Sequence, residues 1–349
     1  EGDDLTVDNG ELLMKVERIE EDRLVCSVVT SGLMGSRRHI NLPGVRLNLP
    51  ALTEKDMADI RVAAECGADF VAGSFVRDAG HVRKLRAALQ AEGSEAEIVS
   101  KLEDQEAIRH LDDIIQESDI IMVARGDLGI EVHVEELPII QRRIVKRCHQ
   151  LGRRVIVATH MLESMTENPT PTRAEVTDVS NAVYEEADAI MLSGETTVGK
   201  HPIRCVQLMD RVARRIERSG GLGYGKEATL RTEKQKVIQA ACGLADSIPH
   251  ALIAVFTRSG FTAHQAALLR PRSPIFAFTP QSSLCSKFTL SRGVRSFKVK
   301  FDEQPRKTIA NAIHFLQQER ELEEGTPIIV VSEIHREGAA VDAILVEHS

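Results

Sequence analysis

A lysine and a glutamate stand two residues apart at the end of an apolar run, AEIVSKLE, residues 96–103. In an extended strand, side chains two residues apart project from the same face, so Lys101 and Glu103 would lie together. Charged groups beside the apolar pair Ile98 and Val99 are costly to bury unless they are paired. Two interpretations follow: an ion pair that closes the strand, or a site in which Glu103 binds a hard cation and Lys101 faces anionic substrate oxygens.

The next apolar run, residues 118–125, ends in the triplet Arg125, Gly126 and Asp127. The triplet could be an adhesion-type recognition loop, a charge-paired turn or one wall of an active site. In an active site, Asp127 and Glu103 on adjacent strands would form a two-carboxylate site that suits Mg²⁺ or Mn²⁺. Gly126 would let a substrate approach the backbone, and the helix expected beyond it would offer N–H groups to an anion. The adhesion interpretation is the weakest, because such a loop needs exposure and the end of a strand that looks buried is a poor place for one.

Three further apolar runs end in polar residues. The runs span 68–75, 154–159 and 187–195, and the polar residues include Ser74, Arg77, Thr159 and Ser193. In parallel α/β folds, functional groups gather where the strands end. We expect Thr159 to contact a substrate and the adjacent His160 to be a surface residue. Ser193 and Gly194 would form either a phosphate cradle or a simple left-handed turn.

The apolar runs alternate with amphipathic stretches, which indicates βα units. One such stretch, residues 137–151, repeats apolar residues at helical spacing and is followed by Gly152, so it predicts a helix with a glycine C-cap. Parallel strands are covered on both faces, which explains why the runs are almost continuously apolar. The predicted fold class is therefore α/β for residues 46–219.

The two ends of the chain differ from this central region. Residues 1–45 resemble a series of short strands and contain the hairpin signal Asn9-Gly10. Residues 230–349 carry a second α/β pattern, and the Gly-rich stretch 218–229 predicts the boundary before it. The sequence thus predicts three regions.

A group of polar residues in the last region follows an apolar run and precedes a helix. The group consists of Thr257, Arg258, Ser259, Gly260 and Thr262. Hydroxyls, backbone N–H groups and a helix N-terminus predict an anion site, and the alternative is a plain N-capped helix. The later stretch 332–342 is expected to be a loop.

Composition argues against several classes of function. The 349-residue chain has a formal net charge of −8 and a pI of about 5.9, so we expect no nucleic-acid partner. No apolar run reaches the roughly 18 residues of a membrane span, so we expect no membrane association. The acidic start, EGDDLTVDNG, matches neither a signal nor a transit peptide. The six cysteines are scattered, which argues against a disulfide scaffold or a zinc site and favours the cytosol.

Five motifs, in this order and at this spacing, resemble the pyruvate kinase family. They are VSKLE (99–103), MVARGDLGIE (122–131), ATHMLESM (158–165), NPTPTRAEVTDVSNAV (168–183) and DAIMLSGET (188–196). The resemblance implies a (β/α)₈ TIM barrel, a β lid domain inserted into it and a C-terminal α/β regulatory domain. By this match residues 1–45 are part of the lid, 46–219 are about five βα units of an incomplete barrel, and 230–349 are the regulatory domain. The chain therefore resembles a fragment that lacks the N-terminal barrel strands.

The resemblance also implies an activity and a set of site residues. The family transfers the phosphoryl group of phosphoenolpyruvate to ADP, giving pyruvate and ATP. Glu103 and Asp127 would hold the divalent cation, Mg²⁺ or Mn²⁺, and Lys101 would stabilise the phosphoryl group in transfer. Gly126, Asp127 and Thr159 would bind substrate, together with Lys101, and Thr159 would also be catalytic, near the enolate face that is protonated. The residues implied to be near the site are Ser74, Arg77, Ala124, Arg125 and Ser193.

Further partners are implied by the same resemblance. A potassium ion would be held by ligands outside this chain, and a sugar phosphate or nucleotide effector would bind the group at 257–262. The parent protein would be a cytoplasmic homotetramer with residues 168–175 near a subunit contact. We expect a fragment with barrel strands missing, and hence with exposed sheet edges, to be inactive alone. The alternative function is a Mg²⁺-dependent barrel lyase or aldolase acting on pyruvate-like substrates, which can also place Glu and Asp on neighbouring strands.

Overall fold

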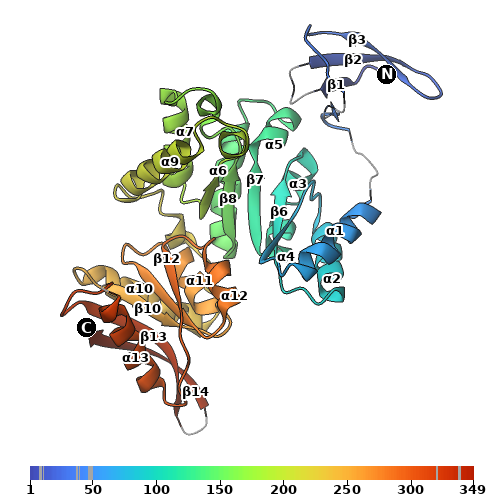
Figure 1. Cartoon of the computed structure of the whole chain (residues 1–349). Helices are drawn as coiled ribbons and strands as arrows, with labels where there is room; N and C mark the ends of the chain where they lie inside the picture. Colours follow the sequence, from blue (N-terminus) through green and yellow to red (C-terminus); the bar gives the residue numbers. More distant parts are fainter. Residues whose placement is uncertain are drawn as a thin grey trace. The chain divides into compact units, whose positions relative to one another are not determined.

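Three β-sheets organise the part of the chain that the computed structural model describes (Figure 1). That part comprises residues 1–7, 10, 12–36, 38, 40–45, 50–319, 321–336 and 339–349, of which the side chains at 333–336 and 339–341 are not described. The chain divides into two compact units, Glu1–Cys148 with Val155–Gly221 and His149–Arg154 with Leu222–Ser349. The domain boundaries expected from composition and resemblance stay predictions.

The N-terminal sheet is antiparallel and has the strand order β3-β2-β1-β4. Its strands are β1 Asp4–Val7, β2 Leu12–Ile19, β3 Leu24–Val28 and β4 Ile40–Asn41. β1 and β2 pair outward from Val7 and Leu12, as expected of a hairpin, and Gly10 between them takes a left-handed φ of +86°. The other residue of the hairpin signal, Asn9, lies outside the described residues. Leu5 joins Val7 and Leu12 in a small buried cluster.

The second sheet holds strands β5 to β9 side by side in chain order. Its strands are β5 Phe70–Gly73, β6 Glu97–Leu102, β7 Ile120–Ala124, β8 Arg154–Ala158 and β9 Ala189–Met191. The pairs β5–β6, β6–β7 and β8–β9 are parallel. Every residue of β7 and β8 is buried, which accounts for their unbroken apolar sequences. All five strands lie within the predicted apolar runs, and the α/β fold class is confirmed.

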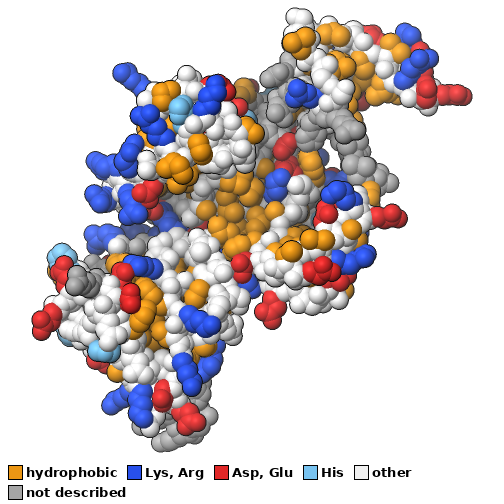
Figure 2. All heavy atoms as spheres, in the orientation of Figure 1, with side chains coloured by type: hydrophobic (Ala, Val, Ile, Leu, Met, Phe, Trp, Pro, Cys, Tyr) orange, Lys and Arg blue, Asp and Glu red, His pale blue; other side chains and the backbone are white. Residues whose placement is uncertain are grey.

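Helices connect the strands of this unit. Their bounds are α1 Glu54–Glu65, α2 Ala79–Ala91, α3 Gln105–Arg109, α4 Leu111–Glu117, α5 Arg125–Glu131, α6 Leu137–Leu151, the 3₁₀ turn η1 Glu163–Thr166, α7 Arg173–Tyr184, α8 Gly194–Thr197 and α9 Pro202–Glu217. α6 coincides with the predicted helix, and Gly152 follows it at a φ of +74°. α9 is amphipathic: it buries Cys205 and Met209, and Figure 2 shows basic side chains gathered along its outer side.

The third sheet, with the order β12-β11-β10-β13-β14, forms the centre of the C-terminal unit. Its strands are β10 Leu252–Phe256, β11 Ile275–Thr279, β12 Val294–Lys298, β13 Pro327–Arg336 and β14 Ala339–His348. The helices are the 3₁₀ turn η2 Tyr224–Glu227, α10 Glu233–Ser247, α11 Phe261–Leu268, α12 Ser282–Phe288 and α13 Pro305–Gln318. In the described ranges, no helix combines the length and the apolar character needed to cross a bilayer.

The expectation of a loop over 332–342 is wrong. β13 continues to Arg336 and β14 begins at Ala339, and the two strands pair antiparallel up to these residues. Backbone hydrogen bonds between neighbouring strands do not depend on side-chain polarity, so a polar and charged stretch can remain extended. The sequence pattern therefore identified the apolar halves of both strands and missed their polar halves.

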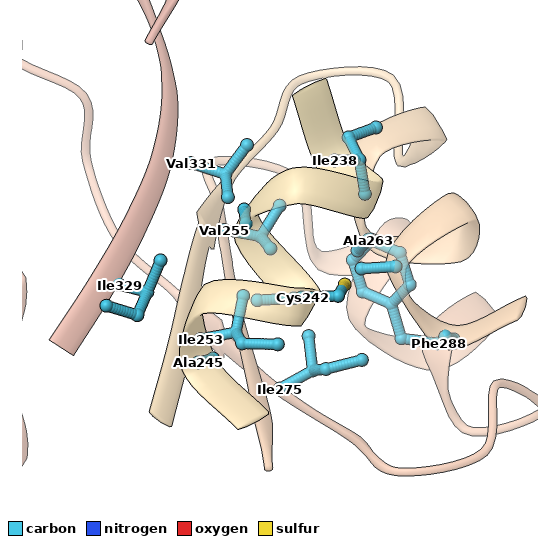
Figure 3. Packing of buried hydrophobic residues seen from close by; sticks show 14 of the residues in the cluster. Ile238, Cys242, Ala245, Ile253, Val255, Ala263, Ile275, Phe288, Ile329 and Val331 are labelled. Carbon is cyan, nitrogen blue, oxygen red and sulfur yellow. The ribbon is translucent and has the colours of Figure 1, made fainter. Parts of the chain in front are cut away.

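Alternate residues of β10 supply two apolar cores, one on each face of the third sheet. On one face, Ile253 and Val255 pack with residues of α10, α11 and α12, among them Phe288 (Figure 3). On the other face, Leu252 and Ala254 pack with residues of α13. The strand is therefore buried on both sides, and its continuous apolar sequence is required by this sandwich.

We expect Phe288→Ala to lower the free energy of unfolding of the C-terminal unit by about 3–5 kcal/mol, because the ring is 1% exposed and its loss leaves a cavity. The chain has no tryptophan, so the change is best measured from the slowest-exchanging amides of β10 and β11 in native-state hydrogen exchange. Phe261→Ala, at a ring that is 39% exposed, is the matched control and should change stability by less than about 1 kcal/mol. Equal effects of the two variants would contradict the assigned core.

Candidate active site

Strands β5 and β6 bring three predicted site residues into contact where they end. The Lys101 Nζ lies 2.7 Å from Glu103 Oε1 and donates a hydrogen bond to Ser74 Oγ at 3.0 Å. The Glu103 side chain is 1% exposed, whereas that of Lys101 is 27% exposed. The ion pair that closes the strand is therefore present, and the lysine that forms it remains accessible from the edge of the sheet.

Glu103 is a buried carboxylate with a partner on each side. Its Oε2 accepts the backbone N–H of Phe75, a residue with a left-handed φ of +50°. Burial raises the pKa of the Glu103 carboxyl above its ordinary value, the hydrogen bond and charge of Lys101 oppose that rise, and the charge of Asp127 adds to it. The two predicted cation ligands, Glu103 and Asp127, thus lie close enough to interact electrostatically.

The donor set at this point fits a hard divalent cation. Glu103 and Asp127 offer carboxylate oxygens, and Mg²⁺ commonly takes one or two carboxylates while it keeps its other positions for water and substrate. In the part of the chain that the structure describes, three or more His, Cys, Asp or Glu side chains nowhere gather in a way that could hold a metal ion. Two carboxylates with open positions are therefore what these residues can supply.

The Arg125-Gly126-Asp127 triplet forms the first turn of α5. The helix was expected to begin beyond the triplet, but it begins at Arg125, directly after β7 ends at Ala124. The Arg125 side chain is 8% exposed, and its Nη1 donates to Asp178 Oδ1 at 2.7 Å. A buried arginine is not available to an adhesion receptor. The triplet is instead a charge-paired turn at the edge where the other candidate residues lie.

Thr159 lies beside the triplet in an unusual backbone conformation. Its φ is +70° and that of His160 is +53°, in the left-handed region that β-branched residues rarely adopt. The Gly126 N–H donates to Thr159 Oγ1 at 2.8 Å, and this hydroxyl donates to Ala158 O at 2.6 Å. An N–H group expected to meet an anion is therefore engaged within the site. His160 is exposed, as expected of a surface residue.

Ser193 and Gly194 enter α8 without a left-handed turn. Ser193 has a φ of −124°, and Gly194, the first residue of α8, does not have a positive φ, so the left-handed alternative is wrong. The Glu195 carboxylate determines this geometry, because it accepts the N–H of Ser193 at 2.7 Å and that of Leu162 at 2.9 Å. Glu195 is 3% exposed, so these bonds are made inside the protein. The phosphate cradle stays a prediction, with the Ser193 N–H already engaged.

Two other predicted residues lie at the margin of the site. Ala124 is buried as the last residue of β7. Arg77 lies near Asp104, the residue that follows Glu103: burial raises the pKa of the Asp104 carboxyl, and the charge of Arg77 opposes that rise. The structure thus places Arg77 beside Asp104 and places Ser74 in contact with Lys101.

Three acidic residues hold the segment around Thr159 and were not predicted as site residues, namely Glu195, Glu175 and Asp178. Glu175 accepts the N–H of Ser164 at 2.7 Å and its hydroxyl at 2.6 Å, and it also accepts the Thr172 N–H at 2.7 Å. The T-x-x-E spacing of Thr172 and Glu175 is a capping-box signal that could have identified this residue. Asp178 has no such signal, because its partner is 53 residues away in the chain.

The polar group after β10 lines a cavity of about 250 Å³ within the C-terminal unit. Its lining includes Thr257, Arg258, Ser259 and Thr262. Thr257 Oγ1 accepts the Gly260 N–H at 2.9 Å, so one amide of the expected anion site is already paired. The Thr262 side chain is buried, and the Arg258 guanidinium lies 5.0 Å from the centre of the Phe301 ring. Anion binding at this group stays a prediction.

Comparison with known protein families identifies relatives along most of the chain. A family model described as "Pyruvate kinase, barrel domain" matches residues 1–206, and one described as "Pyruvate kinase, alpha/beta domain" matches residues 235–346. The matches cover both regions that carry the candidate sites.

Curated relatives agree with these matches. The chain is 39% identical over 333 residues to plastidial pyruvate kinase 2 of Arabidopsis thaliana, covering 95% of this chain and 58% of that protein. It is 40% identical over 296 residues to a pyruvate kinase of Corynebacterium efficiens, covering 85% of this chain and 62% of the relative. A third relative, pyruvate kinase isozyme G, chloroplastic, of Ricinus communis, is 39% identical over 332 residues, with coverages of 95% and 79%. The chain thus spans less than two thirds of the length of the first two.

We expect Glu195→Gln to loosen the segment after Thr159, because the amide NH₂ would face one of the two backbone N–H groups that the carboxylate now accepts. A buried donor left without its partner costs about 1–3 kcal/mol. Hydrogen exchange of the Leu162 and Ser193 amides should accelerate accordingly. Glu167→Gln, which alters an exposed ion pair with Lys200, is the control and should leave both amides unchanged. Unchanged exchange of the Leu162 and Ser193 amides in the Glu195 variant would show that Glu195 does not hold this segment.

Proposed function

The chain belongs to the pyruvate kinase family, and from this premise we propose that its full-length protein transfers the phosphoryl group of phosphoenolpyruvate to ADP, giving pyruvate and ATP. The observation that carries the proposal is the Lys101–Glu103 pair at the end of β6, with the charge of Asp127 acting on the same carboxylate. The chain spans only part of its relatives, so we assign the activity to the full-length protein and not to this chain alone.

In this proposal Lys101 neutralises charge on the phosphoryl group during transfer. Glu103 holds the ammonium from its buried side, and the contact with Ser74 Oγ can be exchanged for a substrate oxygen. Phosphoryl transfer depends mainly on positioning and on electrostatic neutralisation, and a fixed cationic side chain supplies both. The short Lys101–Glu103 contact thus orients the lysine ammonium toward the transferring phosphoryl group.

Glu103 and Asp127 would hold the divalent cation, Mg²⁺ or Mn²⁺. When bound, the cation would orient the substrate oxygens and neutralise part of their charge. A methyl group on Gly126 would lie 3.7 Å from Thr159 Oγ1, so glycine keeps the space in front of this hydroxyl open for substrate. Thr159 then contacts the substrate from the neighbouring strand end, as the family resemblance implies.

Further features of the full-length protein belong to the same proposal. The family uses K⁺, and the ligands for it would lie outside this chain. A sugar phosphate or nucleotide would bind the cavity at Thr257, Arg258 and Thr262, and the protein would be a homotetramer. A cytoplasmic location stays a prediction: two of the relatives are named plastidial or chloroplastic, and the corynebacterial one is not.

The direct test of the proposal is formation of pyruvate and ATP from phosphoenolpyruvate and ADP by the full-length protein. The alternative, a Mg²⁺-dependent lyase or aldolase, receives no support from the family matches. Cleavage of a carbon–carbon bond without formation of ATP would sink the kinase proposal and favour the alternative.

We expect Lys101→Met in the full-length protein to lower kcat for phosphoryl transfer about a hundredfold or more, the size of effect seen when one charge-stabilising donor is lost from an active site. The coupled rate of pyruvate formation measures the loss. Lys55→Met, at an exposed lysine of α1 paired with Asp59, is the control and should retain normal turnover. Near-normal turnover of the Lys101 variant would refute its role.

We expect Asp127→Ala to weaken Mn²⁺ binding about tenfold or more, because one of two carboxylate ligands is lost. Titration of the full-length protein with Mn²⁺, followed by electron paramagnetic resonance, measures the affinity without any need for turnover. Asp210→Ala, which removes an exposed partner of Arg214 on α9, is the matched control. Equal Mn²⁺ affinity in both variants would exclude Asp127 from the ligand set.

A further inference from the structure

The backbone at the end of β8 is held in a conformation that it would not adopt alone. Thr159 and His160 are consecutive, neither is glycine, and both have left-handed φ values, +70° and +53°. Such residues persist only where the surrounding structure over-determines them. The groups that bond the backbone here are therefore the ones that keep Thr159 in place.

The Arg125 guanidinium supplies these bonds on the carbonyl side. Its Nε lies 3.3 Å from Ala158 O and 3.2 Å from Thr159 O, and its Nη2 also donates to Thr159 O. The donors are charged and buried, so each bond is stronger than one between neutral groups. The guanidinium thus bonds the carbonyl groups on both sides of the Thr159 N–H and α-carbon, namely those of Ala158 and of Thr159 itself.

Asp178 holds the far side of the same guanidinium. From α7, its Oδ1 accepts from Arg125 Nη1 at 2.7 Å, and Gln141 Oε1 of α6 lies 3.5 Å from the same nitrogen. Gln141 donates in turn to the buried carboxylate of Glu185 at 2.8 Å. The guanidinium is therefore fixed by groups from α6 and α7 while it bonds the end of β8.

We propose that Asp178 is a positioning residue that acts through Arg125 to hold Thr159 where the substrate meets it. The inference rests on the proposed function, because that function gives Thr159 its contact with substrate. Asp178 itself would not touch the substrate. Rotation of Thr159 out of the left-handed region would turn its carbonyl away from the guanidinium. It would also carry Oγ1 away from the Gly126 N–H that it accepts at 2.8 Å.

Charge alone does not account for this arrangement. All three guanidinium nitrogens of Arg125 are used at once, toward β8, α6 and α7. A lysine at this position would keep the positive charge, but a single ammonium cannot reproduce the planar fork. Arg125→Lys therefore separates a positioning role from a plain ion pair.

The test compares Asp178→Ala and Arg125→Lys with a matched control in the full-length protein. The control, Asp112→Ala, removes an Asp–Arg pair of similar length, 2.6 Å to Arg147, between α4 and α6. For both test variants we expect kcat to fall about tenfold or more, since small misplacement of a contact residue has effects of this size. KM for phosphoenolpyruvate should change less than kcat, and the control should match the wild type.

Hydrogen exchange of residues 158–164 without substrate supplies a second readout. Faster exchange confined to this segment in both test variants supports the proposal. Wild-type kcat in Arg125→Lys, or unchanged kcat and exchange in Asp178→Ala, would overturn it, as would faster exchange spread over the whole unit. If the wild-type protein forms no ATP, the proposed function falls, and the exchange comparison still decides whether Asp178 positions Thr159.

Discussion

The side-by-side order of strands β5 to β9, in which the pairs β5–β6, β6–β7 and β8–β9 are parallel, is the constraint on which the candidate site depends. Strands that run the same way end at the same edge, so residues far apart in the sequence meet there. Lys101 is 27 residues from Ser74, and Gly126 is 33 residues from Thr159, yet both pairs are within hydrogen-bonding distance. No local feature of the chain could bring these groups together.

A second regularity follows from the cost of burying charge. Glu103 accepts the N–H of Phe75 beyond β5, Arg125 donates to the Thr159 carbonyl beyond β8, and Glu195 accepts the N–H of Leu162 in the same segment. In each case a buried charged side chain at one strand end bonds the backbone at a neighbouring one. Such bonds satisfy the charge and the backbone group together. This repeated arrangement connects neighbouring strand ends along the edge of the sheet.

This arrangement explains which parts could be predicted from sequence. Strands β5 to β9 and helix α6 could be predicted from the hydrophobic pattern. Parallel strands are buried on both faces and therefore have continuous apolar sequences, which can be recognised locally. The polar halves of β13 and β14 escaped prediction, since strand pairing rather than apolar content keeps them extended. Asp178 escaped as well, because its partner Arg125 is brought to it only by the tertiary fold.

Two adjacent non-glycine residues in the left-handed region also have a consequence for evolution. At about 1–3 kcal/mol each, Thr159 and His160 take a sizeable share of the roughly 5–15 kcal/mol that stabilises a typical domain. A laboratory selection for heat resistance alone would therefore favour glycine or asparagine at these positions. At Thr159 such a gain would discard the hydroxyl that faces the substrate in our proposal. Thermal robustness and turnover would thus be opposing demands on one residue.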